Sequence, residues 1–185
     1  MLKNKTRLPA GLLILTLLTL LAACRRSEPA QPDSGNVLTL QSTGVTNGIL
    51  STRYTCDGQS IAPPLSWSGA PASTKSYAIT MHHIPPTGEK HVYYILYNLP
   101  ASVVMLPENN TTTGTFGINT VNGRNSYSPP CSQGPGPKTY VLTVYALSVP
   151  SVTMPATTKV TMDVLLDAIN PSVVGKAELP VVYSR

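Results

Sequence analysis

Three long runs of Tyr, Val, Ile and Thr residues constrain the fold of this chain more than any other feature. They occupy residues 76–82, 91–99 and 139–147. β-branched and aromatic residues are favoured in strands, and Pro and Gly punctuate the connections between these runs. Shorter runs at 37–43 and 49–55 extend the pattern. Because there is no internal repeat and no alternation of helix and strand, the sequence predicts a mostly antiparallel β domain.

One segment near the end of the chain has the pattern of a helix instead. Thr161 is suited to be its N-cap, and Asp163 lies in its first turn. Apolar side chains recur along one helical face at Met162, Leu165, Leu166 and Ile169. Asn170-Pro171 ends this helix and is compatible with a further helical turn, before residues 179–184 return to strand character. We therefore expect short C-terminal helices followed by a last strand.

Residues 1–23 have the features of a lipoprotein signal peptide. A basic start is followed by the apolar run GLLILTLLTL and by small residues, and the run is too short for a comfortable membrane span. The sequence LAAC, which ends at Cys24, is similar to a lipobox and implies cleavage before Cys24 and its acylation, for example with palmitate. The alternative is an ordinary buried cysteine after another kind of signal. Residues 24–36 are expected to form a flexible tether, which leaves a domain over 37–185 anchored to a membrane of the cell envelope.

The charge balance and the absence of common motifs exclude several functional classes. Removal of residues 1–23 takes away three of the 13 Lys and Arg residues and none of the 8 Asp and Glu residues. The mature chain is therefore only weakly basic, and its charge does not indicate nucleic-acid binding. The sequence has no G-x-S-x-G, no H-E-x-x-H and no Walker loop. We therefore expect no catalytic activity and no cofactor.

Two cysteines remain in the predicted domain, Cys56 and Cys131. In an oxidising envelope compartment, an even number of cysteines suggests a pair. A disulfide would close a long loop and stabilise the fold by at most ~4 kcal/mol in the chain-entropy model. The sequence does not show that the two residues meet, so two buried free thiols are an equal alternative.

All three histidines of the chain lie close together in sequence, at His82, His83 and His91. Such a cluster is compatible with a metal site, an acid/base site or a ligand pocket. No Ser, Cys or Asp is obviously placed to complete a catalytic site. Alternation along a strand puts His82 and His83 on opposite faces, so only one of them joins His91 easily. If residues 85–88 form the turn between two strands, His82 and His91 both lie near the turn end of the sheet.

Five stretches, in this order along the chain, carry a family resemblance. They are YTCDGQSIAPPLSWSGAP at 54–71, HHIPPTG at 82–88, VYYILYNLPA at 92–101, NSYSPPCSQGPGPKTYVLTVYALS at 125–148 and LLDAINPSVVGKAELPVVYSR at 165–185. Together they resemble the phosphatidylethanolamine-binding protein family, which includes the Raf kinase inhibitor proteins and their bacterial relatives. The resemblance implies a Greek-key fold with a large central antiparallel sheet and a smaller sheet packed on it. It also implies a shallow anion-binding pocket at one end.

The resemblance is weakest at the pocket itself. The family turn Asp-Pro-Asp-Ala-Pro is replaced by His-His-Ile-Pro-Pro at residues 82–86, so both pocket carboxylates are gone. The family Trp and His of the next strand correspond to His91 and Tyr93. In the family motif Gly-x-His-Arg-Tyr, the His is replaced by Lys138 while Tyr140 is retained. The rim sequence YSPPC, which contains Pro130, matches the family well.

These replacements predict a pocket that favours anions. The residues expected to converge there are His82, His91, Tyr93, Pro130, Lys138 and Tyr140. Lys138 and a protonated imidazole donate charge-assisted hydrogen bonds to phosphate or carboxylate, whereas an ethanolamine ammonium has lost its carboxylate partner. We therefore expect a non-catalytic protein that binds an anionic small molecule, a phospholipid headgroup or a partner motif. The alternatives are a metal-binding protein that uses His82 and His91, and a protein-protein regulator with a vestigial pocket.

Overall fold

The structure is a computed structural model that describes residues 37–155 and 159–185. The predicted signal peptide, the lipidation residue Cys24 and the tether that ends at residue 36 lie outside the described residues. In the part of the chain that is described, no helix has the length and apolar character needed to cross a membrane.

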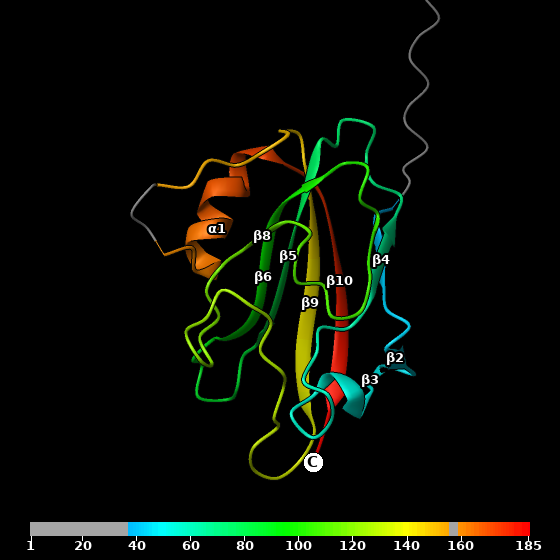
Figure 1. Ribbon diagram of the computed structural model, residues 1–185, viewed down its shortest axis with the longest axis vertical. Coiled ribbons are helices and arrows are strands. Elements are labelled where there is room, and N and C mark those ends of the chain that lie inside the picture. The colour runs from blue at the N-terminus through cyan, green and yellow to red at the C-terminus, as the bar shows by residue number, and fades with distance from the viewer. Residues whose placement is uncertain (1–36, 156–158) are drawn as a thin grey trace, which may run out of the picture. The chain divides into compact units, whose positions relative to one another are not determined.

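A seven-stranded sheet forms the centre of the domain (Figure 1). In spatial order its strands are β2 (Val45–Thr46), β3 (Ile49–Leu50), β10 (Val173–Tyr183), β9 (Lys138–Leu147), β5 (Ser76–His83), β6 (His91–Pro100) and β8 (Thr115–Phe116). Neighbouring strands are antiparallel except β3 and β10, which are parallel. The three long predicted runs therefore lie side by side as β9, β5 and β6.

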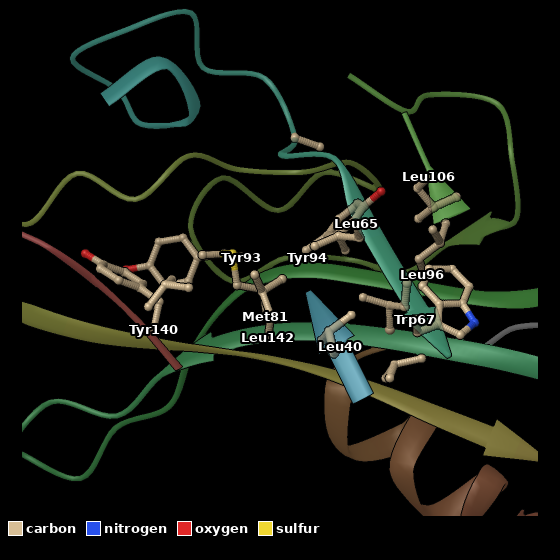
Figure 2. Packing of buried hydrophobic residues seen from close by; sticks show 14 of the residues in the cluster. Leu40, Leu65, Trp67, Met81, Tyr93, Tyr94, Leu96, Leu106, Tyr140 and Leu142 are labelled. Carbon is tan, nitrogen blue, oxygen red and sulfur yellow. The ribbon is translucent and has the colours of Figure 1, made fainter. Parts of the chain in front are cut away.

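A small three-stranded sheet packs on one face of the large sheet. It consists of β1 (Thr39–Gln41), β4 (Leu65–Ser68) and β7 (Met105–Leu106), paired antiparallel. Buried side chains from both sheets fill the space between them, among them Leu40, Trp67, Leu106, Met81 and Leu142. Figure 2 shows this layer of side chains, with Tyr93 and Tyr140 at one end of it.

The other face of the large sheet is covered by α1 (Met162–Ile169). Thr161 is its N-cap, as predicted, and its side chain accepts a hydrogen bond from the Val164 backbone N–H at 3.3 Å. The apolar face of the helix buries Met162, Leu165 and Ile169 against the sheet. Because both faces are covered, six consecutive residues of β5 and six of β6 are buried, which explains why these runs are apolar almost throughout.

The predicted fold class is confirmed: the domain is mostly β, with a large and a small sheet and a short C-terminal helix. Two segments differ in detail. Residues 52–54 form a 3-10 turn instead of continuing the strand, because Ser51 caps the turn by accepting a hydrogen bond from the Arg53 N–H. β10 begins at Val173 instead of residue 179, directly after a 3-10 turn at Asn170–Ser172.

Candidate functional site

A pocket of about 620 Å³ lies where β5 ends and where β6 and β9 begin. Since these three strands are neighbours and antiparallel, their adjoining ends meet at the same edge of the sheet. The strand residues that line the pocket are His83, His91, Tyr93, Lys138 and Tyr140. Four of the six residues predicted to converge, His91, Tyr93, Lys138 and Tyr140, are thus brought together by the fold.

His83, and not His82, is the second histidine of this pocket. It is paired directly with His91 across the β5–β6 ladder, so both side chains lie on the same face. The His83 ring packs on Tyr140, with centroids 5.3 Å apart, and its Nδ1 lies 2.7 Å from the carbonyl oxygen of Thr139. With an exposed fraction of 8%, the side chain is held firmly in the pocket wall.

His82 lies on the opposite face of the sheet, which corrects the prediction that it belongs to the pocket. It pairs with Val92 and is half-buried. Burial, followed by the nearby charge of Lys90, lowers the pKa of the His82 imidazole. The suggested metal pair of His82 and His91 is therefore not formed. Across residues 37–155 and 159–185, no group of three or more His, Cys, Asp or Glu side chains is arranged to hold a metal ion.

A β-bulge places Tyr93 in the pocket. Tyr94 pairs with Met81, and Val92 pairs with His82, so Tyr93 is the one extra residue on β6 between these pairs. As a result, Tyr93 and Tyr94 both face the layer under the small sheet. The Tyr93 ring meets Tyr140 edge to face, with centroids 5.1 Å apart. The bulge therefore joins the end of the apolar core to the pocket wall.

Two connecting segments form further walls. The β5–β6 turn contributes Glu89. The loop after β8 contributes Thr120 and Val121, and it is fastened to β6 because Thr120 Oγ1 accepts a hydrogen bond from the Val92 N–H at 2.8 Å. Within this loop, the buried side chain of Asn119 accepts two backbone N–H bonds and donates to two carbonyl oxygens. These bonds fix the loop as one side of the pocket.

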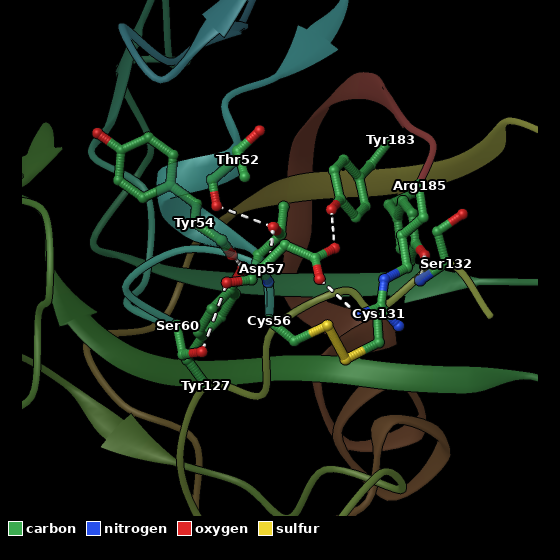
Figure 3. Close-up of a disulfide and its surroundings, with 12 residues drawn as sticks. Thr52, Tyr54, Cys56, Asp57, Ser60, Tyr127, Cys131, Ser132, Tyr183 and Arg185 are labelled. Carbon is green, nitrogen blue, oxygen red and sulfur yellow. Dashed lines mark hydrogen bonds and ion pairs between the residues drawn. A yellow bond between two sulfur atoms is a disulfide. The ribbon is translucent and has the colours of Figure 1, made fainter.

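A disulfide between Cys56 and Cys131 ties the last wall to the rest of the domain (Figure 3). Cys131 lines the pocket, and the Cys56 N–H donates to the carbonyl oxygen of Pro130 at 3.1 Å. Pro130 itself is buried behind the wall, while its neighbour Pro129 lines the pocket. Pro130 is therefore not among the lining residues, whereas Pro129 and Cys131, on either side of it, are.

Ser132 completes this wall and was missed by the sequence-based reasoning. Its backbone N–H donates to the Tyr140 hydroxyl at 3.3 Å, and its side chain is buried without a hydrogen-bond partner among the described residues. The retained rim sequence ends one residue before Ser132, at Cys131. The position of Ser132 follows from the disulfide and from the Tyr140 bond, neither of which is visible in the sequence.

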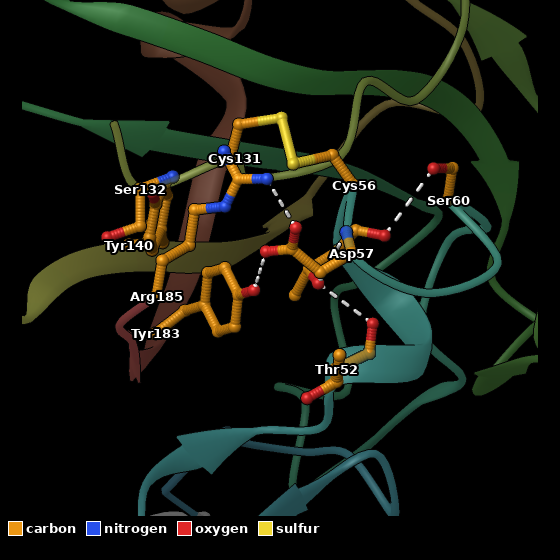
Figure 4. Close-up of polar contacts among 10 residues, drawn as sticks. Thr52, Cys56, Asp57, Ser60, Cys131, Ser132, Tyr140, Tyr183 and Arg185 are labelled. Atoms are coloured by element: carbon orange, nitrogen blue, oxygen red, sulfur yellow. Dashed lines mark hydrogen bonds and ion pairs between the residues drawn. A yellow bond between two sulfur atoms is a disulfide. The ribbon is translucent and has the colours of Figure 1, made fainter. Parts of the chain in front are cut away.

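Asp57, beside the disulfide, anchors the end of the chain (Figure 4). Its carboxylate accepts a hydrogen bond from the Tyr183 hydroxyl and another from the Arg185 guanidinium at 2.5 Å. The Tyr183 hydrogen bond, and then that of Arg185, lowers the pKa of the Asp57 carboxyl. This cluster connects the end of β10 to the loop that carries Cys56.

Hydrogen-bond donors dominate the chemistry of the pocket. Burial raises the pKa of both Tyr93 and Tyr140, so these phenols stay protonated and keep O–H groups to donate. The Lys138 ammonium donates to the carbonyl oxygen of Gln133 at 2.5 Å and supplies a positive charge. Glu89 is the one carboxylate among the described residues that line the pocket. The arrangement suits an anionic group.

Comparisons with known proteins agree on one family. The sequence model of the phosphatidylethanolamine-binding protein family matches residues 41–184. A protein of Methanothermobacter thermautotrophicus called UPF0098 protein is 32% identical over 143 residues, which are 75% of this chain and 92% of that protein. The UPF0098 protein YbcL of Escherichia coli is 27% identical over 183 residues, with 93% and 97% of the two chains covered.

Two crystal structures have similar folds. One is a putative phosphatidylethanolamine-binding protein homologue of Chlamydia trachomatis, with a TM-score of 0.73 and 30% identity over 81% of this chain and 99% of that chain. The other is YbcL of Escherichia coli, described as a member of the mammalian phosphatidylethanolamine-binding protein family. Its TM-score is 0.70 at 26% identity, over 80% of this chain and 98% of that chain.

Proposed function

The chain belongs to the phosphatidylethanolamine-binding protein family, and on that premise we propose that it is a non-catalytic protein whose pocket binds an anionic group. The group is a phosphate or carboxylate on a small molecule, a lipid headgroup or a motif of a partner protein. The pocket volume, about 620 Å³, is in the range of small-molecule sites and leaves room for an organic part beside the anion.

The observation that carries this proposal is the placement of Lys138 among neutral donors. Its ammonium shares the pocket with His91 and with the protonated phenols of Tyr93 and Tyr140. A hydrogen bond from one of these groups to an anion is stronger than a hydrogen bond between two neutral groups. The pocket therefore favours an anion over a cation. Among the described residues that line the pocket, Glu89 is the one carboxylate that an ethanolamine ammonium would find. The amine is therefore not the group that the pocket selects.

Attachment to the cell envelope is a second part of the proposal. It is supported by the basic start, the apolar run and the LAAC sequence that ends at Cys24. Fractionation of cells that produce the full chain tests it. We expect the protein in the membrane fraction, with an acylated N-terminal peptide in its mass spectrum. A Cys24→Ser variant should lose the acyl mass and leave the membrane fraction. A wild-type chain without acyl mass would contradict the anchor.

The pocket is tested by NMR titration of the full chain in an uncharged detergent, with inorganic phosphate and with O-phosphoethanolamine. We expect saturable shifts at Lys138 and Tyr140, and similar affinity for the two ligands because the amine adds little. Lys138→Met should weaken both ligands roughly tenfold or more, since a charged hydrogen bond contributes about 1.5–3 kcal/mol. Lys75→Met, at an exposed position before β5, is the matched control and should leave both affinities unchanged.

Two results would count against the anion pocket. One is the absence of pocket shifts with either ligand while the spectrum stays that of a folded protein. The other is an equal loss of affinity in Lys138→Met and Lys75→Met, which would show that the positive charge acts only through the overall charge of the molecule. In either case, recognition of a protein partner through another surface would be the alternative function.

A further inference from the structure

A second pocket, of about 260 Å³, lies beside the edge strand β8. Its walls are residues 60–62 before β4, residues 109–111 after β7, Phe116 of β8 and residues 125–127. Among the described residues, none lines both this pocket and the one at the ends of β5, β6 and β9. The volume is smaller than that of most drug-sized sites, about 300–1,000 Å³, so the second pocket has room for one small ring.

The residues that line the second pocket are uncharged. Three of them carry carboxamides and three carry hydroxyls: Asn109, Asn110, Asn125, Ser60, Thr111 and Ser126. Within the described part of the chain, no Lys, Arg, His, Asp or Glu contributes to this lining. A charged ligand would therefore give up its hydration without meeting an opposite charge, which is unfavourable. The lining favours a neutral ligand.

The charged residues that flank the lining in sequence do not change this conclusion. Glu108 precedes Asn109, and its carboxylate accepts two hydrogen bonds from the Arg53 guanidinium, at 2.8 and 2.9 Å. These bonds lower the pKa of the Glu108 carboxyl, which stays ionised and bound to Arg53. Arg124, which precedes Asn125, is exposed and is not part of the lining.

Two aromatic rings add a fixed apolar surface to the second pocket. Phe116 and Tyr127 both line it, and both pack on Tyr94, with ring centroids 6.0 Å and 5.5 Å from that of Tyr94. The Tyr127 hydroxyl donates to the carbonyl oxygen of Tyr54 at 2.6 Å, so its polar end is already satisfied. The face of an aromatic ring is negative and attracts C–H groups. The lining therefore suits a ring that has C–H groups as well as polar ones.

Hydrogen bonds between the walls hold the shape of the second pocket. The Asn109 N–H donates to the carbonyl oxygen of Ala62 at 2.9 Å. The buried side chain of Asn110 accepts from the Thr113 N–H at 3.1 Å and donates to the Thr113 carbonyl oxygen at 3.0 Å. Asn109 and Asn125 are exposed, so their carboxamides can exchange water for a ligand.

From this lining we propose that the second pocket binds a neutral sugar ring. A sugar hydroxyl both donates and accepts hydrogen bonds, and the carboxamides and hydroxyls of the lining also do both. The C–H groups of the ring pack on the aromatic surface of Phe116 and Tyr127. Because this site shares no lining residue with the proposed anion pocket, the inference can be tested independently of the proposed function.

The test is an NMR titration of the full chain in an uncharged detergent without a sugar head group. The ligands are glucose and N-acetylglucosamine, their charged counterparts glucuronate and glucosamine at about pH 6, and cytosine as a flat ring without hydroxyls. We expect saturable shifts of the Asn110 and Phe116 amide signals with the neutral sugars, while the Lys138 signals stay in place. The charged counterparts should bind about tenfold or more weakly, because no opposite charge lines the pocket.

Two asparagines give a matched pair of variants. Asn109 lines the second pocket, and Asn47 lies in the turn between β2 and β3. Both are exposed and both have left-handed backbone, with φ of 55° and 51°. Replacement by Gly removes the carboxamide and keeps this backbone conformation accessible. Asn109→Gly should weaken binding of the neutral sugars about two- to tenfold, whereas Asn47→Gly should leave it unchanged.

Several results would overturn the inference. They are the absence of saturable shifts with either neutral sugar in a folded chain, equally tight binding of the charged counterparts, and binding of cytosine in place of the sugars. Equal sugar affinities in Asn109→Gly and Asn47→Gly would overturn it as well. Because the wild-type titrations are decisive by themselves, the inference does not depend on the folding of either variant.

Discussion

The carboxylate of Asp57 holds the guanidinium of Arg185 at 2.5 Å, although the two residues are 128 positions apart in the chain. The Tyr183 hydroxyl donates to the other carboxylate oxygen. One side chain thus links the loop before β4 with the end of β10, next to the disulfide wall of the pocket.

This cluster predicts a specific dependence of stability on pH. The pKa of Asp57 is lower in the folded chain than in the unfolded one, so its contribution is complete above the pKa of an unfolded Asp, about 4. The contribution is lost as the pH falls through the folded value. We expect Asp57→Asn to lower the free energy of unfolding near neutral pH, by an amount that shrinks below about pH 4. Denaturant titrations of both proteins across this range measure it. Asp167→Asn, on the exposed face of α1, is the control. A difference between wild type and Asp57→Asn that does not change with pH would contradict the linkage.

The disulfide predicts that its reduction lowers the free energy of unfolding by a large amount. Its cysteines are separated by 75 positions, and a loop of that length corresponds to about 4 kcal/mol in the chain-entropy model. The double variant Cys56→Ser/Cys131→Ser should therefore unfold at markedly lower denaturant concentration. A thiol reductant should move the wild-type transition towards that of the variant and leave the variant unchanged. Equal transitions for oxidised and reduced wild type would show that the bond adds no stability.

The hydrogen bond between the Ser132 N–H and the Tyr140 hydroxyl predicts that removal of this hydroxyl destabilises the chain locally at Ser132. Tyr140→Phe removes the acceptor of the Ser132 N–H and leaves a buried donor, at a cost of about 1–3 kcal/mol. Amide hydrogen exchange at Ser132 should accelerate more than exchange in the centre of β9. Tyr145→Phe is the matched control, because Tyr145 is on the same strand and no side-chain hydrogen bond holds it within the described residues. Unchanged exchange at Ser132 in Tyr140→Phe would refute the bond.

The packing of α1 predicts a contrast between adjacent leucines. Leu165 is fully buried against the large sheet, whereas Leu166 is only partly buried. Leu165→Ala should cost about 2–5 kcal/mol through lost contacts and a residual cavity. Leu166→Ala should cost clearly less, although both remove the same atoms from the same helix. Chemical denaturation distinguishes them, and equal losses would mean that α1 does not dock as the structure shows.

The strands and the helix could be predicted because their signals are local. The β-branched and aromatic residues of 76–83, 91–100 and 138–147 favour strands by themselves. The Thr161 cap and the spacing of Leu165 and Ile169 likewise favour a helix without help from distant residues.

The identity of the pocket histidine could not be predicted, because it depends on register. Alternation shows that only one of His82 and His83 shares a face with His91, but it does not say which. The pairing of His83 with His91 is decided by the turn and by the bulge at Tyr93. Ser132 was missed for a similar reason, since its place depends on a disulfide and on a hydroxyl from another strand.

The bulge at Tyr93 also bears on how such a protein can diverge. It separates β6 into a portion that ends in the pocket and a portion, from Tyr94 onwards, that packs in the core. On each side of the bulge, the alternation of side chains between the two faces of the sheet is independent of the alternation on the other side. Substitutions at His91, which lines the pocket and is not part of the core, can therefore accumulate without disturbing the packing of Ile95 or Leu96. A lineage that keeps this bulge can change the lining of its pocket at His91 while its hydrophobic interior stays constant.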